Sequence, residues 1–423
     1  MNPARLEQKL LFLILLFLPT QLGRHFWPDF SYIYSLKVDY LSPTIYFWDL
    51  LVVCLLIVFI LQKKVVKRIA LNLFLFFIIT QALSLIGSLD PGAGLVRLEQ
   101  YITVGLFGVY LASYKWVELK TQLFLPLSIV VIFESLLGIG QFLLEGSLGF
   151  WVLGERAFSI STPAIAKFNF QGIELLRPYA TFPHPNTLAA FLVLMIPVLT
   201  ITTPTKKYPK TFALALFLSI VTVILSVSRT SFIAGLVELI YFLKRKGFLI
   251  IIAVMLLTSP FLYTRFESIF DYDNLSIIRR EEFVDTALNL FKTSPLLGIG
   301  LNNFIPESSG NIASGENRFL QPVHNIYLLT LSETGILGLI GLVALIGYPV
   351  WLLVHSLWFM EKSNKPRTKN NEQSTILLLW FVAIFLGMFD HYFLTQPQGL
   401  RMLFLIWGLS LAKVRQGQQL ERS

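Results

Sequence analysis

Twelve apolar stretches follow one another along this chain of 423 residues. A helix that crosses a bilayer needs roughly 20 mostly apolar residues, and a soluble fold cannot bury so many segments of this kind. Only 14% of the residues are charged and the mean hydropathy is +0.68, whereas a soluble domain carries roughly 25% charged residues. The sequence therefore predicts an all-α integral membrane protein with about twelve transmembrane helices. The predicted spans are 10–25, 44–62, 69–87, 95–113, 121–143, 185–203, 211–228, 231–243, 248–263, 325–355, 374–393 and 399–412.

The basic residues predict how these spans are oriented. If the N-terminus is cytoplasmic and the spans alternate, the cytoplasmic segments hold 21 of the 34 lysines and arginines, including the runs 63–68 and 244–246. Lysine and arginine accumulate on the cytoplasmic side of membrane proteins, so we expect both termini there. Leu10–Leu22 resembles the core of a signal peptide, but no small-residue cleavage site follows it. We therefore expect a retained first span.

The charge pattern and the cysteine count exclude several classes of partner. The net charge of +9 is spread over short runs between apolar segments, so it reports topology and no nucleic-acid partner is expected. Cys54 is the single cysteine. It cannot form an intrachain disulfide and makes no metal site with the five scattered histidines. We expect neither a metal nor another cofactor.

Two regions are expected. Residues 1–143 would form the first five helices. Residues 144–423 would form a core of the remaining seven, with long outer loops at 144–184 and 264–323. In the second loop Ser276 can cap a helix with a mostly apolar face, which stops before a turn-rich connection at 298–303. A helix lying on the membrane surface fits this loop.

Polar residues able to do chemistry gather at four junctions between spans. On the predicted topology all four lie on the outer side of the membrane. Charge near lipid is costly to desolvate, and an anionic ligand held at the outer face explains why it is there. The junctions are Arg177–Asn186 with His184, Ser226–Ser231 with Arg229, Val323–Tyr327 with His324 and Asn325, and Asp390–Arg401.

The same residues also have ordinary structural interpretations. Interfacial arginines often reach toward headgroup phosphates, a lone histidine is more often a structural residue, and Asn186 and Asn325 can simply cap helices. Asp271-Tyr272-Asp273 matches a metal-binding pattern of nucleotide-sugar transferases, with loop solvation as the default interpretation. The coincidence of arginine and histidine at separate outer junctions favours an anion site. The planar arginine fork binds two diphosphate oxygens at once, and a neutral histidine can take a proton from a hydroxyl.

Ordered motifs between about Arg177 and Gly408 resemble the O-antigen ligase/polymerase superfamily, the WaaL- and Wzy-like membrane glycosyltransferases. The first five spans are similar only in character, and Ala180 stands where many members have glycine. The motifs are the Arg…Thr-Phe-x-His-Pro-Asn segment, the Ser-Arg-Thr link, the Pro-Leu-x-Gly-x-Gly-x-Asn-x-Phe turn, the His-Asn-x-Tyr-Leu…Glu-x-Gly helix and the terminal Asp-His-Tyr…Gln-Gly.

This resemblance implies a fold of about twelve helices with a large periplasmic loop. It also implies transfer of a glycan from an undecaprenyl-diphosphate-linked oligosaccharide donor to an acceptor, without metal or nucleotide. By motif, His324 would be the catalytic base, and Arg177 and Arg229 would bind the diphosphate. The acceptor stays open between a glycan, a lipid and a protein. The further candidates for substrate binding are His184, Asn186, Asn325 and Arg401.

A transporter or flippase for an anionic lipid-linked glycan is the alternative. Such a protein exposes charged residues along a path through the membrane, whereas here the positive cluster is confined to the outer end. The sequence therefore favours an inverting, metal-independent glycan transferase. It would be embedded in the bilayer of the cytoplasmic (inner) membrane, with its active site facing outward.

Overall fold

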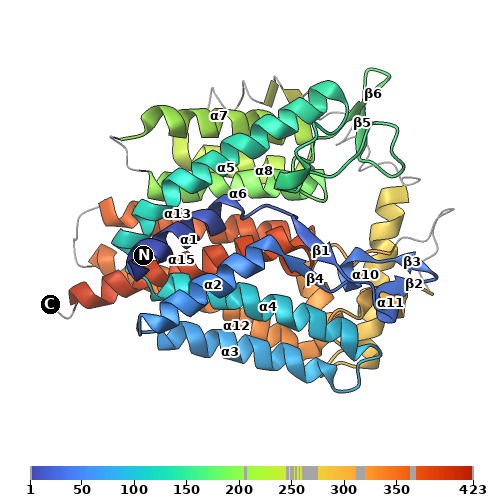
Figure 1. The fold of residues 1–423 in the computed structure, drawn as a ribbon, viewed down its shortest axis with the longest axis horizontal. Helices are drawn as coiled ribbons and strands as arrows, with labels where there is room; N and C mark the ends of the chain where they lie inside the picture. The colour runs from blue at the N-terminus through green and yellow to red at the C-terminus, as the bar shows by residue number, and fades with distance from the viewer. Residues whose placement is uncertain are drawn as a thin grey trace.

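The computed structural model describes residues 2–203, 207–243, 275–310, 320–362 and 368–421, with a few single residues between 247 and 259. These residues form a bundle of long helices, and 72% of the structure is helical. The two termini lie at one end of the bundle, and the short strands, α10 and α11 lie at the other end (Figure 1). The helices are α1 (Pro3–Leu16), α2 (Phe47–Leu61), α3 (Arg68–Ala82), α4 (Pro91–Ser113), α5 (Trp116–Leu144), α6 (Pro185–Thr202), α7 (Pro209–Ser226), α8 (Arg229–Leu243), α10 (Leu275–Thr293), α11 (Phe304–Ser308), α12 (Ile326–Lys362), α13 (Thr368–Gly387), α14 (Tyr392–Thr395) and α15 (Pro397–Glu421).

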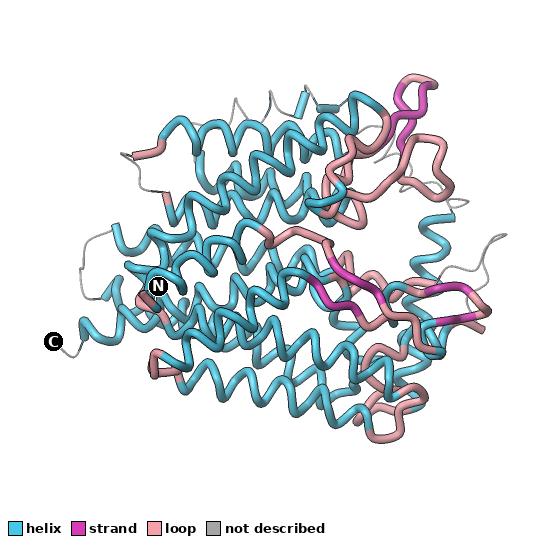
Figure 2. Tube along the Cα trace, viewed as in Figure 1, coloured by secondary structure: helices cyan, strands magenta, loops and turns pink. Residues whose placement is uncertain are grey.

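Three small antiparallel pairs of strands lie at the end of the bundle opposite the termini (Figure 2). The first outer loop supplies two pairs, β1 with β4 and β2 with β3, and the loop before α6 supplies the hairpin β5–β6. The strands are β1 (Gly23–His25), β2 (Tyr32–Ile33), β3 (Leu36–Lys37), β4 (Thr44–Tyr46), β5 (Lys167–Phe170) and β6 (Ile173–Leu176).

The predicted helical membrane architecture is confirmed in its coarse form. Among the described residues, five helical segments are long and apolar enough to cross a bilayer by themselves: Arg68–Leu85, α5, α6, α7 and Ile326–Phe359. The count of about twelve spans is not confirmed by this criterion, because helices such as α2 and α8 have only 15 residues. Eleven of the twelve predicted segments nevertheless overlap a helix. The remaining one, 248–263, lies largely outside the described residues.

The first helix differs from its predicted limits of 10–25. It starts at Pro3 because the Asn2 side chain accepts a hydrogen bond from the backbone N–H of Ala4 at 3.0 Å and proline suits the first helical turn. It ends at Leu16, and Gly23–His25 becomes strand β1, paired with β4. The outer part of the predicted span is therefore a turn and irregular chain followed by the short strand β1.

Helix α15 forms the centre of the bundle. Every residue from 398 to 414 is buried, which is the pattern of a helix surrounded by protein on all sides. Its approach to α4 is close: a side chain at Gly408 would lie 2.7 Å from the carbonyl oxygen of Gly108. Small residues at such a crossing let two helix backbones come together inside a membrane protein.

The predicted helix of the large outer loop is present as α10. Its apolar residues Phe283 and Ala287 are buried against Phe304, Val323 and Leu329. Part of its apolar face is therefore removed from water by α11 and the residues around the start of α12. Its position on the membrane surface stays a prediction.

Helix α12 is broken at Gly335, whose φ of 65° and ψ of −166° are open only to glycine. The chain segment 295–300 fills the break. The N–H groups of Ile299 and Gly300 donate to the carbonyl oxygens of Ser332 and Glu333 at 3.0 and 2.9 Å, and the N–H of Ile336 donates to Pro295 at 2.9 Å. The predicted glycine-rich connection therefore clamps the outer loop onto α12, just below His324.

We predict that Gly335→Ala destabilises the protein. The backbone strain alone amounts to about 1–3 kcal/mol, and the new Cβ would lie 2.4 Å from the backbone carbonyl of Leu296. Gly347→Ala is the matched control, because a Cβ there meets no atom within 4 Å among the described residues. Melting temperatures of the two purified variants in the same detergent test this, and equal values would contradict the clamp.

Candidate active site

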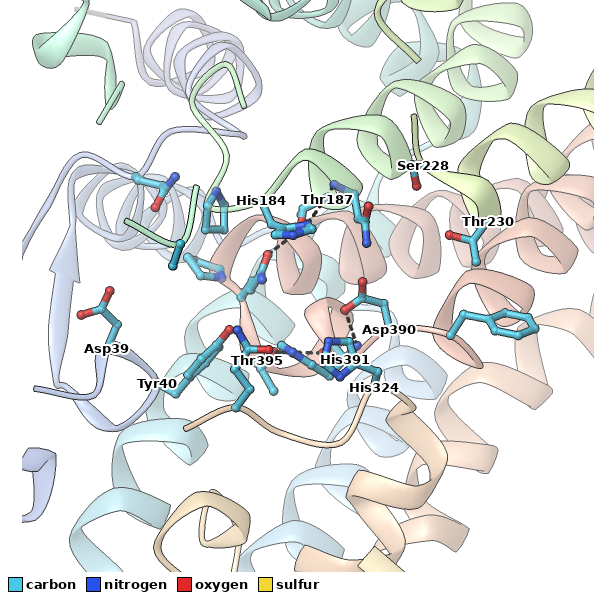
Figure 3. A pocket seen from close by; sticks show the side chains of 18 of the residues that line it. Asp39, Tyr40, His184, Thr187, Ser228, Thr230, His324, Asp390, His391 and Thr395 are labelled. Carbon is cyan, nitrogen blue, oxygen red and sulfur yellow. Dashed lines mark hydrogen bonds between the residues drawn. The ribbon is translucent and has the colours of Figure 1, made fainter. Parts of the chain in front are cut away.

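One cavity of about 670 Å³ receives side chains from all four predicted junctions. The first junction contributes Arg177, His184 and Asn186, the second contributes Arg229, and the third contributes His324. Asp390 and His391 of the link between α13 and α14 also face it (Figure 3). Residues that lie more than 200 positions apart in the sequence are thus brought to one place, as an anionic ligand at this end of the bundle would require.

The charge of the cavity wall is strongly positive. Six arginines line it against two carboxylates, Asp39 and Asp390. Positive charge concentrated in a partly enclosed space raises the local concentration of an anionic ligand. The cavity therefore suits a phosphate-bearing substrate. The arginines are Arg97, Arg156, Arg177, Arg229, Arg279 and Arg280.

Arg177 is held in place by two helix ends. Its backbone follows β6, and its Nε donates to the carbonyl oxygen of Ser226 at 2.6 Å, at the end of α7. One of its terminal nitrogens donates to Oδ1 of Asn186 at 2.7 Å, at the start of α6. Asn186, predicted as a substrate-binding residue, therefore lines the cavity while it orients Arg177.

The turn that carries Arg229 is coupled to this arrangement. Val227 takes a left-handed conformation with φ of 50° and ends α7, and Arg229 is the first residue of α8. Ser226 of the same turn accepts the hydrogen bond from Arg177. The two arginines that the sequence predicts as diphosphate ligands are therefore fixed to one short piece of backbone.

His184 caps helix α6. Its Nδ1 accepts a hydrogen bond from the N–H of Asn186 at 3.1 Å, which leaves the proton of the neutral ring on Nε2. Burial, reinforced by the charge of Arg177, lowers the pKa of His184 to about 3. The neutral ring of His184 can therefore donate a hydrogen bond from Nε2. Its Nδ1 already accepts the hydrogen bond from Asn186, so it is not available as a base.

A second group consists of His324, Asp390 and His391. Their potential ligand atoms all lie within 4.8 Å of one another, and the two imidazole rings have a centroid separation of 5.1 Å. His391 Nδ1 lies 2.6 Å from Thr395 Oγ1, which itself donates to the His391 carbonyl, so Nδ1 carries the proton. His324 Nδ1 is buried and has no hydrogen-bond partner among the described residues.

The protonation states of this group suit proton transfer. Burial lowers the pKa of His324 to about 3, although the Asp390 carboxylate acts in the opposite direction, and burial lowers that of His391 to about 4. Burial opposes the ionisation of Asp390, but interaction with His391, His324, His184 and Arg280 outweighs it, so the pKa of Asp390 is lowered. At neutral pH the group therefore combines one carboxylate with two neutral imidazoles.

The same three side chains could also hold a divalent metal ion. Two neutral imidazoles and a carboxylate are common ligands of zinc and of related ions. The other metal candidate from the sequence, Asp271 with Asp273, lies outside the described residues. Within the described part of the chain, the geometry therefore supplies one group of possible metal ligands, and this group includes the predicted base His324.

Two predicted binding residues do not line the cavity. Asn325 caps α12, since its Oδ1 accepts from the N–H groups of Tyr327 and Leu328 at 2.9 and 3.0 Å. Arg401 is completely buried within α15. It donates to the carbonyl oxygens of Leu18 and Thr20 at 3.1 and 2.9 Å, and it lies over the ring of Trp48. The structure gives both residues structural roles in place of the predicted contact with substrate.

Several cavity residues are absent from the sequence-based set. Arg279 and Arg280 come from α10. Two adjacent arginines in the predicted outer helix could have indicated from the sequence that this helix contributes to an anion site. Asp39 and Tyr40 belong to the first outer loop, and Arg156 to the loop after α5. No motif or periodicity marks these three positions, because tertiary packing alone brings them to the cavity.

Comparison with known proteins identifies part of this chain. Residues 214–343 match the family model of the O-antigen ligase. The match covers the turn of Arg229, helix α10 and His324, while Arg177, His184 and the first outer loop lie outside it. No curated protein matches the chain.

We predict that Arg177→Lys and Arg229→Lys weaken the binding of inorganic pyrophosphate by about tenfold or more. Lysine keeps the charge but loses the fork, and a charge-assisted hydrogen bond contributes roughly 1.5–3 kcal/mol. Arg401→Lys is the control: it should lower the melting temperature and keep the parent's affinity. Titration calorimetry on the purified variants checks this, and unchanged affinity in both cavity variants would remove the arginines from the anion site.

Proposed function

We propose that this chain, which belongs to the O-antigen ligase/polymerase superfamily through its residues 214–343, transfers a glycan between lipid-linked and acceptor molecules. The donor would be an undecaprenyl-diphosphate-linked oligosaccharide, and the reaction would take place at the outer face of the cytoplasmic membrane. The observation that carries this proposal is the cavity itself: six arginines line a space that is also lined by His324.

The arginines supply the donor site. Arg177 and Arg229 would bind the two phosphates, because a guanidinium fork matches two oxygens and keeps its charge at any physiological pH. The neutral His184 would donate its Nε2–H to the same anion. Positive charge here acts twice: it holds the donor, and it stabilises the negative charge that develops on the diphosphate as the sugar departs.

His324 would act as the general base. The acceptor oxygen attacks the anomeric carbon while the bond from that carbon to the diphosphate oxygen breaks, and the acceptor proton passes to the neutral imidazole of His324. The products are the glycosylated acceptor and undecaprenyl diphosphate. Asp390 would stabilise the imidazolium that forms, since its carboxylate lies within 4.8 Å of His324. Attack opposite the leaving group inverts the anomeric configuration.

The topology proposed from the basic residues agrees with this arrangement. The termini lie at the end of the bundle opposite the strands and α10 (Figure 1), and the cavity is lined by the loops that carry those strands. With both termini in the cytoplasm, the cavity would open toward the exterior or periplasm. The lipid tail of the donor would remain in the bilayer beside the helices.

We predict that His324→Gln loses about 10²–10⁴-fold of the transfer rate and keeps the parent's pyrophosphate affinity. An amide can hydrogen-bond but cannot take the proton, and general-base catalysis contributes about that factor. Transfer is measured with lipid-linked oligosaccharide and acceptor extracted from a strain deleted for this gene. A Gln variant with the parent's rate would leave His391 as the next candidate.

The dependence of kcat/KM on pH in the acidic range provides an independent test of His324 as the base. The base must be neutral, and burial keeps the pKa of His324 near 3 in the free protein. Activity is lost only as the pH falls through this lowered pKa, so kcat/KM should stay level well below the roughly 6.5 of an unperturbed histidine. Prior treatment with EDTA should leave activity intact. Loss of activity that added zinc restores would instead make the His324–Asp390–His391 group a metal site.

A further inference from the structure

The wall of the cavity opposite the arginine-bearing turn comes from the first outer loop. Asp39 and Tyr40 reach the cavity from this loop, and they lie far outside the segment 214–343 that matches the ligase family. In Figure 3 they lie on one side of His324, Asp390 and His391, and Ser228 and Thr230 lie on the other side. The proposed base therefore stands between two chemically different walls.

The loop is held rigidly in this position. The carbonyl oxygen of Tyr40 accepts from Arg97 at 3.2 Å and from the Asn302 side chain at 3.1 Å. Val38 and Leu41 on either side are buried against Ala93 and Ile305. A segment fixed by hydrogen bonds and apolar contacts from two other parts of the chain is preorganised to bind a ligand without an ordering cost.

The side chains on this wall differ from those on the arginine wall. The ring of Tyr40 lies 5.6 Å from that of His391, edge to face, and its hydroxyl interacts with Gln396. The Asp39 side chain is exposed, and it makes no hydrogen bond or ion pair with the described residues. A carboxylate with unused acceptor positions beside an aromatic ring and amide groups suits a ligand that carries several hydroxyl groups.

The position of this wall fits the second substrate of the proposed reaction. In an inverting displacement the nucleophile and the leaving group lie on opposite sides of the reacting carbon. If the diphosphate is held near Arg229, the attacking hydroxyl must approach from the side of Asp39 and Tyr40.

We propose that Asp39 and Tyr40 of the first outer loop form an acceptor subsite that binds the sugar of a glycan acceptor. This inference rests on the proposed function and selects one of its three open acceptor classes. Asp39 accepts hydrogen bonds from hydroxyl groups of the acceptor sugar. Tyr40 supports one face of that sugar next to His391, so that the reacting hydroxyl points toward His324.

The test uses full-length purified protein in nanodiscs, with the donor and acceptor fractions of a deletion strain's lipid extract. Asp39→Ala and Tyr40→Ala should raise KM for the acceptor by about tenfold or more and leave the Kd for inorganic pyrophosphate unchanged. Asp29→Ala is the matched control, because Asp29 is an exposed carboxylate of the same loop that does not line the cavity. It should behave like the parent in both measurements.

A second arm identifies the acceptor class. Periodate treatment of the acceptor fraction destroys vicinal hydroxyl groups and should abolish transfer, whereas proteinase K treatment should leave it intact. The opposite result, or a parent-like acceptor KM in both loop variants, overturns the subsite. If the parent binds pyrophosphate and releases undecaprenyl diphosphate while these results fail, the error lies in the subsite alone. A parent that does neither removes the proposed function together with the subsite.

Discussion

The hydrogen bonds of the Arg177 guanidinium hold the cavity together. They join the end of α7, through the carbonyl of Ser226, to the start of α6, through the side chain of Asn186. Leaving the N–H groups of a buried guanidinium without partners costs free energy, so these bonds favour the observed placement of both helix ends. Arg229 follows on the same turn and His184 caps the same helix. The wall of the cavity that carries these residues therefore depends on the satisfaction of one buried charge.

Burial then divides the remaining titratable groups by role. It makes the three histidines neutral and leaves Asp390 ionised. A wall of permanent positive charge next to neutral imidazoles can bind a diphosphate without protonating its own base. The clamp between residues 295–300 and the broken helix α12 contributes by holding the start of that helix, and therefore His324, against α10.

The features predicted from the sequence are those that depend on neighbouring residues in the chain. Apolar length located eleven helices, and short motifs at their ends identified Arg177, His184, Arg229 and His324, which share one cavity. Arg401 does not line the cavity, because α15 begins at Pro397 and Arg401 is buried over the ring of Trp48. Asp39 and Tyr40 could not be found, since their position depends on Arg97 and Asn302, more than 200 residues apart.

The most direct test follows the fate of the donor in proteoliposomes that contain only this protein. An undecaprenyl-diphosphate-linked oligosaccharide, labelled in its sugar, is supplied with the acceptor fraction on the outer side. The account predicts that the label leaves the lipid and appears on the acceptor with inverted anomeric configuration, with one undecaprenyl diphosphate released per transfer. Label that crosses the bilayer while still attached to its lipid would contradict the account and identify a transporter.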